Sequence, residues 1–283
     1  MLQKIKFLLT IYGLSLSFFL PQLTWAKSFE EDIKETGILK IGIRQDSPLF
    51  GLGNSYEGYC QDFGQELTKI IGQKWNKKIK LELIKSTTQN RWDLVKNKIA
   101  HFECGPNTIN LQREKESNIK FSQPFFVTAT QVFTKPQVQE EALIKGTIGV
   151  IKNTTNEEDI KKVYSPEQIN NSFLNRRQGI EAVQQGKIEG FASDGILLMG
   201  TTLALQLNPN SYNILTPLKD DRPFCAAYGM ILPDGEDNAA WRKTVNELIA
   251  KTGKGEVIWD QWFLPFFPYL AKVLQGCQSP VNK

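Results

Sequence analysis

The sequence of 283 residues contains a single histidine, His101. Catalytic arrangements that pair a histidine with a serine or a cysteine would all have to use this one side chain. The sequence also lacks the motifs GxGxxG, HExxH and the phosphate-binding P-loop. We therefore start from binding rather than catalysis, and we expect a protein that is not an enzyme and has no cofactor.

Long apolar runs are scarce as well. The run from Phe7 to Leu20 is shorter than the roughly 20 residues that a membrane-spanning helix needs. Lys4 and Lys6 precede it, and small residues ending at Ala26 follow it, which is the order of a secretory signal peptide. We expect residues 1–26 to be a cleaved signal peptide. An uncleaved membrane anchor is the alternative.

Neither sign of charge is in large excess. The formal net charge is +4, and it falls to +2 when Lys4 and Lys6 leave with the signal peptide. Nucleic-acid binding depends on clustered positive charge, so we expect no nucleic-acid partner. With 41% hydrophobic and 23% charged residues, the composition is that of an ordinary globular protein.

The four cysteines do not form a CxxC motif; they are Cys60, Cys104, Cys225 and Cys277. Cysteine-based metal sites need such close spacing, so we expect no bound metal. An even number of cysteines in an exported chain favours disulfides, for which three pairings are possible. Buried free cysteines remain the alternative.

Apolar patterns of strand and helix type alternate along the chain. Strand patterns cover residues 39–44, 79–84, 147–151 and 188–192, and helical patterns cover 63–71, 90–99 and 179–185. Alternating strands and helices predict mostly parallel sheets flanked by helices. The stretch FSQPFFVTATQVF separates two such blocks, so the sequence predicts two α/β lobes.

Polar residues follow the predicted strands, at the edge where ligands bind in open α/β sheets. They are Arg44, the segments TTQNR, GPNT and NTT, and Ser193 with Asp194. An arginine binds a carboxylate with two parallel hydrogen bonds, and a buried carboxylate binds an ammonium group. Arg113 and Asp194 are the complementary pair that a small zwitterion would need.

Several motifs occur in an order that resembles a known family. They are GIRQDSPLFG, EGYCQDFGQEL, TTQNRWDLVKN, FECGPNTINLQRE with FSQPFF, the NTT turn, FASDG, and AAYGMILPDG with a closing WDQWF. The chain resembles periplasmic solute-binding proteins of polar amino-acid ABC transporters, and most closely their glutamate/aspartate-binding members. The resemblance covers about Gly37 to Phe263.

The resemblance implies a two-lobed periplasmic-binding-protein fold of type II, in which the chain crosses between the lobes twice. The first lobe would comprise residues 27–125 and 228–283, and the second lobe residues 126–227. The protein would be a periplasmic monomer that binds an amino acid between its lobes and delivers it to an ABC permease in the inner membrane. It also implies the disulfides Cys60–Cys104 and Cys225–Cys277.

The resemblance further implies roles for individual residues. Arg113 would bind the ligand α-carboxylate with Thr108 and Thr155, and Asp194 would bind the α-ammonium group. The ligand side-chain carboxylate would meet the cations and hydroxyl of Arg44, Thr88, Arg91 and Arg176. Arg176 falls near a position where the acidic-ligand members have histidine, and Arg177 is a possible substitute.

Each of these residues also has a plainer interpretation. Arg44 could pair with Asp46 at the surface, Arg91 could lie on a helix face, and Arg113 could be a solvated helix charge. Asp194 could be only a turn or helix-capping residue.

Two other functions compete with transport. An enzyme on the same fold, similar to cyclohexadienyl dehydratases, would use Glu103 or His101. A ligand-binding sensor domain would need a membrane anchor.

Overall fold

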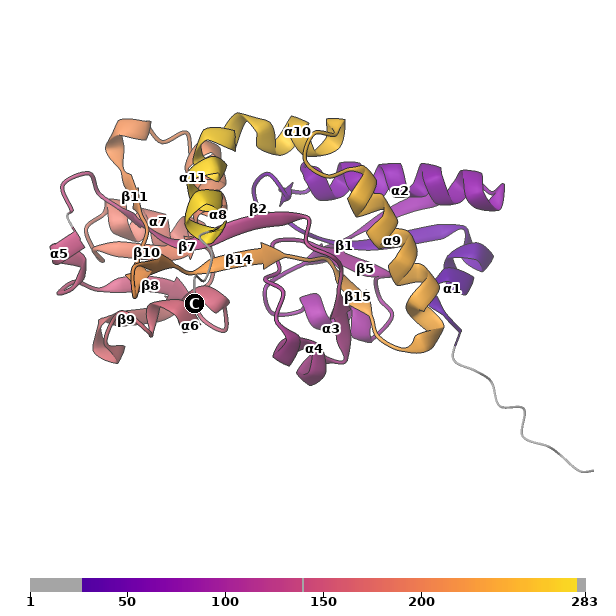
Figure 1. Cartoon of the computed structure of the whole chain (residues 1–283), viewed down its shortest axis with the longest axis horizontal. Coiled ribbons are helices and arrows are strands. Elements are labelled where there is room, and N and C mark those ends of the chain that lie inside the picture. Colours follow the sequence, from indigo (N-terminus) through magenta and orange to yellow (C-terminus); the bar gives the residue numbers. More distant parts are fainter. Residues whose placement is uncertain (1–26, 139, 279–283) are drawn as a thin grey trace, which may run out of the picture.

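The computed structural model describes residues 27–138 and 140–278, so the expected signal peptide lies outside the described residues. Within these ranges no helix has the length and apolar character needed to cross a membrane. The chain forms two lobes, each built on its own sheet, as Figure 1 shows.

The sheet of the first lobe has the strand order β4-β1-β5-β15-β6. Its strands are β1 (Ile38–Arg44), β4 (Lys80–Ser86), β5 (Phe102–Cys104), β6 (Ile119–Phe121) and β15 (Ile231–Pro233). Its helices are α1 (Phe29–Thr36), α2 (Tyr59–Trp75), α3 (Arg91–Lys96), α4 (Leu111–Ser117), α9 (Ala239–Lys251) and α10 (Val257–Phe263). The first three strands of this order run parallel, β15 runs antiparallel to its neighbours β5 and β6, and β6 therefore has the same direction as the first three.

The sheet of the second lobe has the order β11-β7-β10-β8-β9. Its strands are β7 (Phe126–Thr134), β8 (Ile148–Ile151), β9 (Ile169–Phe173), β10 (Gly190–Asp194) and β11 (Asn213–Leu215). Its helices are α5 (Glu140–Leu143), α6 (Thr155–Ile160), α7 (Arg176–Gln184) and α8 (Gly195–Ala204). Strands β10, β8 and β9 run parallel, as the alternating pattern predicts.

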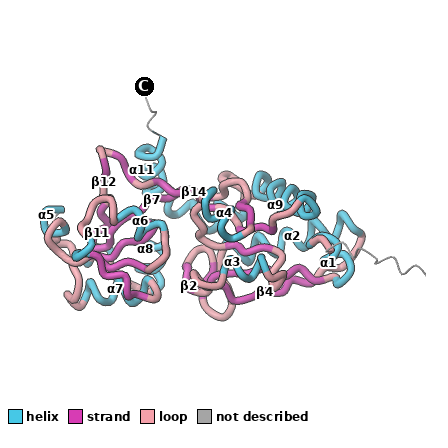
Figure 2. The backbone as a smooth tube through the Cα atoms, turned by 90° about the horizontal axis from the view of Figure 1, so that it is seen from below, coloured by secondary structure: helices cyan, strands magenta, loops and turns pink. Residues whose placement is uncertain are grey.

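Two strands connect the lobes. Strand β7 leaves the first lobe at Phe126, and β14 (Cys225–Tyr228) returns beside it in antiparallel register. The final helix, α11 (Phe267–Gln278), follows the 3₁₀ turn η4 (Leu264–Phe266) and lies alongside β7 and β14 in both Figure 1 and Figure 2. The expected fold class, with two crossings between lobes, is confirmed.

The remaining elements are short. Two hairpins are formed by β2 (Asp46–Ser47) with β3 (Gly51–Leu52) and by β12 (Leu218–Lys219) with β13 (Arg222–Pro223), and three further 3₁₀ turns are η1 (Pro166–Gln168), η2 (Pro209–Ser211) and η3 (Glu236–Asn238).

Aromatic packing fills the first lobe up to the crossing strands. Phe50 is fully buried, and its ring lies 5.6 Å from those of Phe126 and Tyr228 and 5.2 Å from that of Phe263. Buried aromatic rings contribute large apolar areas and favour such edge and tilted contacts. This cluster fixes the root of both crossing strands to the first lobe.

The structure contains both disulfides that the resemblance implies. Cys60 on α2 is bonded to Cys104 at the end of β5, with 5.6 Å between their Cα atoms. Cys225 at the start of β14 is bonded to Cys277 on α11, with 5.8 Å between the Cα atoms. The first bond joins helix to sheet within the first lobe, and the second ties the end of the chain to a crossing strand.

Candidate ligand-binding site

The strand ends of the first lobe bring polar side chains together because β1, β4 and β5 are parallel and in register. Arg44 ends β1 directly opposite Ser86, which ends β4. The turn after β5 then carries Asn107 and Thr108. These carboxyl ends face the second lobe, so the expected edge of the sheet lies at the boundary between the lobes.

Arg44 is buried, whereas Asp46, its ion-pair partner, is 39% exposed. The Arg44 side chain is 1% exposed, and its Nε lies 3.2 Å from Oδ1 of Asp46. Its Nη2 donates to Oγ1 of Thr88 at 2.6 Å, which brings these two expected site residues together. Burial opposes the charge on Asp46, but Arg44 and Arg176 together hold the pKa of Asp46 below its ordinary value.

A buried carboxylate, Glu103, lies behind the arginines of the first lobe. It is 0% exposed and accepts hydrogen bonds from Ser86 Oγ at 2.7 Å and from Asn107 Nδ2 at 2.5 Å. Burial raises the pKa of Glu103, and the charges of Arg44 and Arg91 oppose this shift. Glu103 therefore partly balances the two arginines that flank it.

Arg91 is buried although it begins a helix. It is 5% exposed, its guanidinium carbon lies 4.3 Å from the ring centroid of Trp92, and its Nη1 donates to Asn107 Oδ1 at 3.4 Å. Its Nε has no hydrogen-bond partner among the described residues. Burial first, and then the neighbouring charges of Arg44 and other arginines, lower the pKa of Arg91 to about 9. The interpretation as an exposed helix-face charge is wrong.

Arg176 and Arg177 differ in burial. Arg176 begins α7, is 6% exposed, and donates from Nε to Ser193 Oγ at 2.9 Å. Its Nη1 has no hydrogen-bond partner within the described ranges. Arg177 points to solvent and lies 3.6 Å from Glu181 one turn along the same helix. Burial therefore favours Arg176 over Arg177 as the candidate site residue.

Asp194 ends β10 and is the residue before α8. It is 4% exposed, and although it stands at the N-cap position its side chain makes no capping hydrogen bond. Its Oδ1 has no partner among residues 27–138 and 140–278. Burial raises the pKa of Asp194, opposed by the charge of Arg176 and by the polar side chains of Tyr228 and Asn156. A buried carboxylate held near a cation can receive a further positive group.

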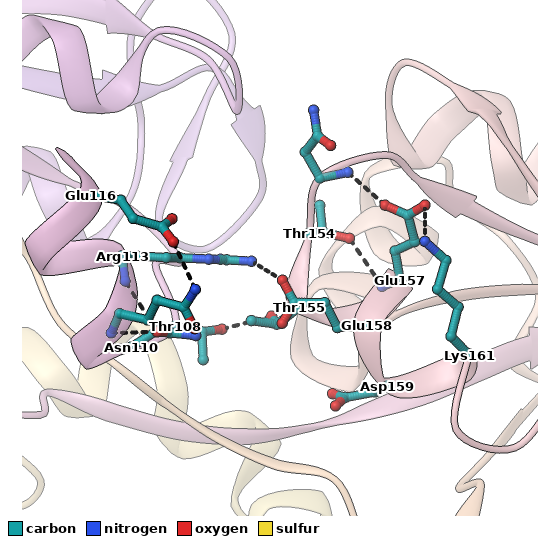
Figure 3. Close-up of polar contacts among 12 residues, drawn as sticks. Thr108, Asn110, Arg113, Glu116, Thr154, Thr155, Glu157, Glu158, Asp159 and Lys161 are labelled. Atoms are coloured by element: carbon teal, nitrogen blue, oxygen red, sulfur yellow. Dashed lines mark hydrogen bonds and ion pairs between the residues drawn. The ribbon is translucent and has the colours of Figure 1, made fainter.

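The two lobes touch through the remaining expected residues, which Figure 3 shows between α4 and α6. Thr108 Oγ1 lies 3.1 Å from Thr155 Oγ1. Arg113 Nη2 lies 2.7 Å from Oε1 of Glu158, and the Arg113 side chain is only 15% exposed. Arg113 is therefore not a freely solvated helix charge. Its ion-pair partner among the described residues is Glu158 and not Asp194.

Arginines from both lobes lie near one another. The positive charges of Arg44, Arg113 and Arg176 all lower the pKa of Arg91, so these three guanidinium groups repel that of Arg91. Buried positive charges that repel one another favour the binding of an anion. Asp194 adds a negative group on the side of the second lobe.

Several residues of this site were not expected from the sequence. The sequence does not indicate Glu158 as a partner of Arg113, and it does not place Tyr228 and Asn156 beside Asp194. It suggests Asp46 only as a surface partner of Arg44 and Glu103 only as a catalytic acid. One sequence feature does point to a special role for Glu103, because it is a charged residue within the short strand segment HFECG.

Neither part of the chain that the structure describes contains three or more His, Cys, Asp or Glu residues grouped to hold a metal ion. The polar groups of the site are instead guanidinium, carboxylate, hydroxyl and amide groups, which bind small charged organic molecules.

The chain matches a family of known proteins. The model for the bacterial extracellular solute-binding proteins, family 3, matches residues 39–265, and the chain belongs to this family. It is similar to the glutamate/aspartate import solute-binding protein of Escherichia coli (strain K12), with 27% identity over 251 residues, covering 84% of this chain and 80% of that protein.

Two further proteins extend the comparison. A glutamine-binding protein of Geobacillus stearothermophilus is 29% identical over 199 residues, covering 69% of this chain and 73% of its own length. Among solved structures, an ancestral amino acid-binding protein that is a precursor of cyclohexadienyl dehydratase has a TM-score of 0.68 and 18% identity, covering 85% of this chain and 99% of that one. At this identity the likeness concerns the fold.

Proposed function

We propose that this chain is the periplasmic substrate-binding component of an ABC transporter for polar L-amino acids, with glutamate or aspartate as its ligand. It delivers the ligand to the permease in the inner membrane and works as a monomer. Family membership supports the binding role, and the relative from Escherichia coli supports the acidic ligand. The relative from Geobacillus stearothermophilus makes glutamine the ligand to test against.

The four neighbouring arginines are the main reason to propose an acidic ligand. Arg44, Arg91 and Arg176 face the carboxylates of Asp46, Glu103 and Asp194, and with Asp194 engaged by the ligand ammonium group one positive charge is left over. Arg113 would hold the α-carboxylate and Asp194 the α-ammonium group. A ligand with a second carboxylate would then meet the remaining positive charge, whereas a neutral amide would leave it unbalanced in a desolvated site.

In this proposal binding works by closure of the lobes. The first lobe contributes Arg44, Thr88, Arg91, Thr108 and Arg113, and the second lobe contributes Thr155, Arg176 and Asp194. Contacts to both sets exist only when the lobes are together, so the ligand shifts the open and closed populations toward the closed form. The permease would recognise that form, and no bond of the ligand is made or broken.

The position of His101 argues against an enzyme that would use this residue. Its Nδ1 accepts a hydrogen bond from the backbone of Lys40 at 2.8 Å, and its Nε2 lies 3.0 Å from Asp32. Lys40 stands toward the start of β1, whereas Arg44 ends it. His101 is therefore at the opposite end of the sheet from the proposed ligand.

Calorimetric titration of the protein comprising residues 27–283 with each of the twenty amino acids tests the proposal. We expect glutamate or aspartate to bind with a Kd near micromolar, about −8 kcal/mol, and glutamine to bind more weakly. Tighter binding of glutamine would overturn the acidic ligand. Conversion of prephenate or arogenate to an aromatic product would overturn the binding role itself.

A further inference from the structure

Helix α11 runs along the hinge, from the first lobe toward the second. Near its start, the ring of Phe267 lies 4.3 Å from Nζ of Lys254, which follows α9. Further along, the helix packs against β7 and β13, and Figures 1 and 2 both show it beside the crossing strands. Its Cys277 is bonded to Cys225, the first residue of β14. The helix is therefore fastened to the strands about which the lobes move.

One side chain of α11 reaches the second lobe next to the proposed ammonium site. The hydroxyl of Tyr269 donates a hydrogen bond to Oε1 of Gln131 on β7. Gln131 in turn donates from Nε2 to Oγ1 of Thr216 at 2.7 Å. In the ladder between β7 and β10, Gln131 is directly opposite Ser193, the residue before Asp194. The hydrogen bond thus lies behind the strand end that carries Asp194.

The glycine after Asp194 shows how closely these groups pack. A Cβ atom at Gly195 would overlap both the Tyr269 hydroxyl and the Gln131 amide oxygen. Burial, followed by the negative charge of Asp194, raises the pKa of Tyr269. The tyrosine hydroxyl, the glutamine amide and the Asp194–Gly195 turn therefore form one packed unit.

The orientation of Asp194 needs support from outside its own helix. An aspartate at an N-cap position is normally held by hydrogen bonds to the first backbone N–H groups, and Asp194 makes none. The Tyr269–Gln131 pair packs against Gly195, the residue after Asp194, and limits how the Asp194–Gly195 turn can move. Tyr269 lies on α11, and the Cys225–Cys277 disulfide fastens this helix to β14. Helix α11 therefore supports the Asp194–Gly195 turn through Tyr269.

We propose that Tyr269 is a positioning residue for Asp194, held in place by α11 and the Cys225–Cys277 disulfide. This inference rests on the proposed function, in which Asp194 binds the ligand α-ammonium group. Tyr269 does not touch the ligand. It restricts the turn that carries Asp194, so that the carboxylate meets the ammonium group without first being ordered by the ligand.

A double-mutant cycle tests the inference with glutamate as the probe. Y269F removes only the hydroxyl, and we expect about a tenfold rise in the Kd for glutamate with the wild-type Asp194. In D194N, which we expect to bind at millimolar glutamate, adding Y269F should change the Kd less than twofold. A tenfold loss in both backgrounds, or none in either, would overturn the inference. Y212F, which removes a hydroxyl hydrogen-bonded to Thr202 elsewhere in the second lobe, is the matched control and should bind as wild type.

A second variant probes the fastening of the helix. C225S/C277S leaves Cys60–Cys104 in place, and we expect it to weaken glutamate binding by about the same factor as Y269F, with little further loss when the two are combined. Unchanged binding in C225S/C277S would contradict the claim that the disulfide holds Tyr269 in place. If the wild-type protein binds no amino acid, the proposed function fails. If it binds glutamate and Y269F binds equally well, only the inference fails.

Discussion

Arg113 on α4 and Glu158 on α6 form an ion pair of 2.7 Å between the two lobes. Arg113 is the residue proposed to hold the ligand α-carboxylate, and Glu158 presents a carboxylate of the protein to the same guanidinium group (Figure 3). The Glu158 side chain is 55% exposed, so the pair is worth little as a source of stability. Its consequence is competition, because a ligand carboxylate must share or replace Glu158.

We therefore expect E158Q to bind glutamate more tightly than wild type, by about threefold, in line with the value of an exposed ion pair. Calorimetry at low salt measures the change, which should shrink as salt screens the pair. E181Q is the matched control, because it removes an exposed glutamate paired with Arg177 away from the site. Weaker binding by E158Q would mean that the pair helps closure instead of competing with the ligand.

The two arginines of the first lobe should have different effects on ligand choice. R113A removes the partner of the α-carboxylate, which all amino acids share, and should weaken every ligand by about a hundredfold or more. R44A should weaken glutamate more than glutamine, because it removes charge from the side-chain end. Titration of both variants with both ligands measures the difference. Equal losses for the two ligands in R44A would contradict the assignment of Arg44 to the side chain.

R44A should also lower the free energy of unfolding, because the buried carboxylate of Glu103 would lose a neighbouring positive charge. Breaking a buried pair from one side costs about 3 to 5 kcal/mol. Replacing Glu103 as well, in R44A/E103Q, should recover part of this loss in a denaturant titration. If the double variant is as unstable as R44A, Glu103 is not balanced by Arg44.

Glutamate affinity should fall as the pH rises through about 9. Burial and the neighbouring arginines lower the pKa of Arg91 to about 9, so Arg91 is charged at neutral pH and becomes neutral above this value. Only the charged form of Arg91 attracts the ligand carboxylate. Glutamate should therefore bind more weakly at higher pH, where Arg91 has lost its proton. Titrations from pH 7 to 10 measure it.

The ligand ammonium group also loses its proton in alkaline solution, so R91Q serves as the control for this pH series. The part of the pH dependence that belongs to Arg91 should be missing in R91Q. Identical pH profiles for R91Q and wild type would contradict the assignment.

The Cys60–Cys104 disulfide should matter for stability and not for ligand choice. It closes a loop with a sequence separation of 44 and lies fully buried in the first lobe. Replacing both cysteines with alanine should lower the free energy of unfolding by about 2 to 4 kcal/mol. The variant should still prefer glutamate over glutamine at a temperature where it is folded. A changed preference would show that the bond also shapes the turn after β5.

The sequence by itself determined the elements with a clear apolar pattern and their order. The apolar pattern at residues 39–44 predicts a strand, and β1 spans Ile38–Arg44; the polar NTT segment follows a predicted strand, and its Thr154 is the N-cap of α6. Periodicity and capping are local properties, so they can be read without the fold. The order of motifs extended this reading to the two lobes and to both disulfides.

Only the tertiary structure decided which charges meet. It buries Arg44 beside Asp46 and places Glu103 near Arg44 and Arg91, and it pairs Arg113 with Glu158 across the lobes. It also brings Tyr269 from the last helix to the turn after Asp194. The charges around Glu103 depend on how the strands and helices of the first lobe pack together. The contacts of Arg113 and Tyr269 depend on how elements of the two lobes are placed against each other, which no local pattern encodes.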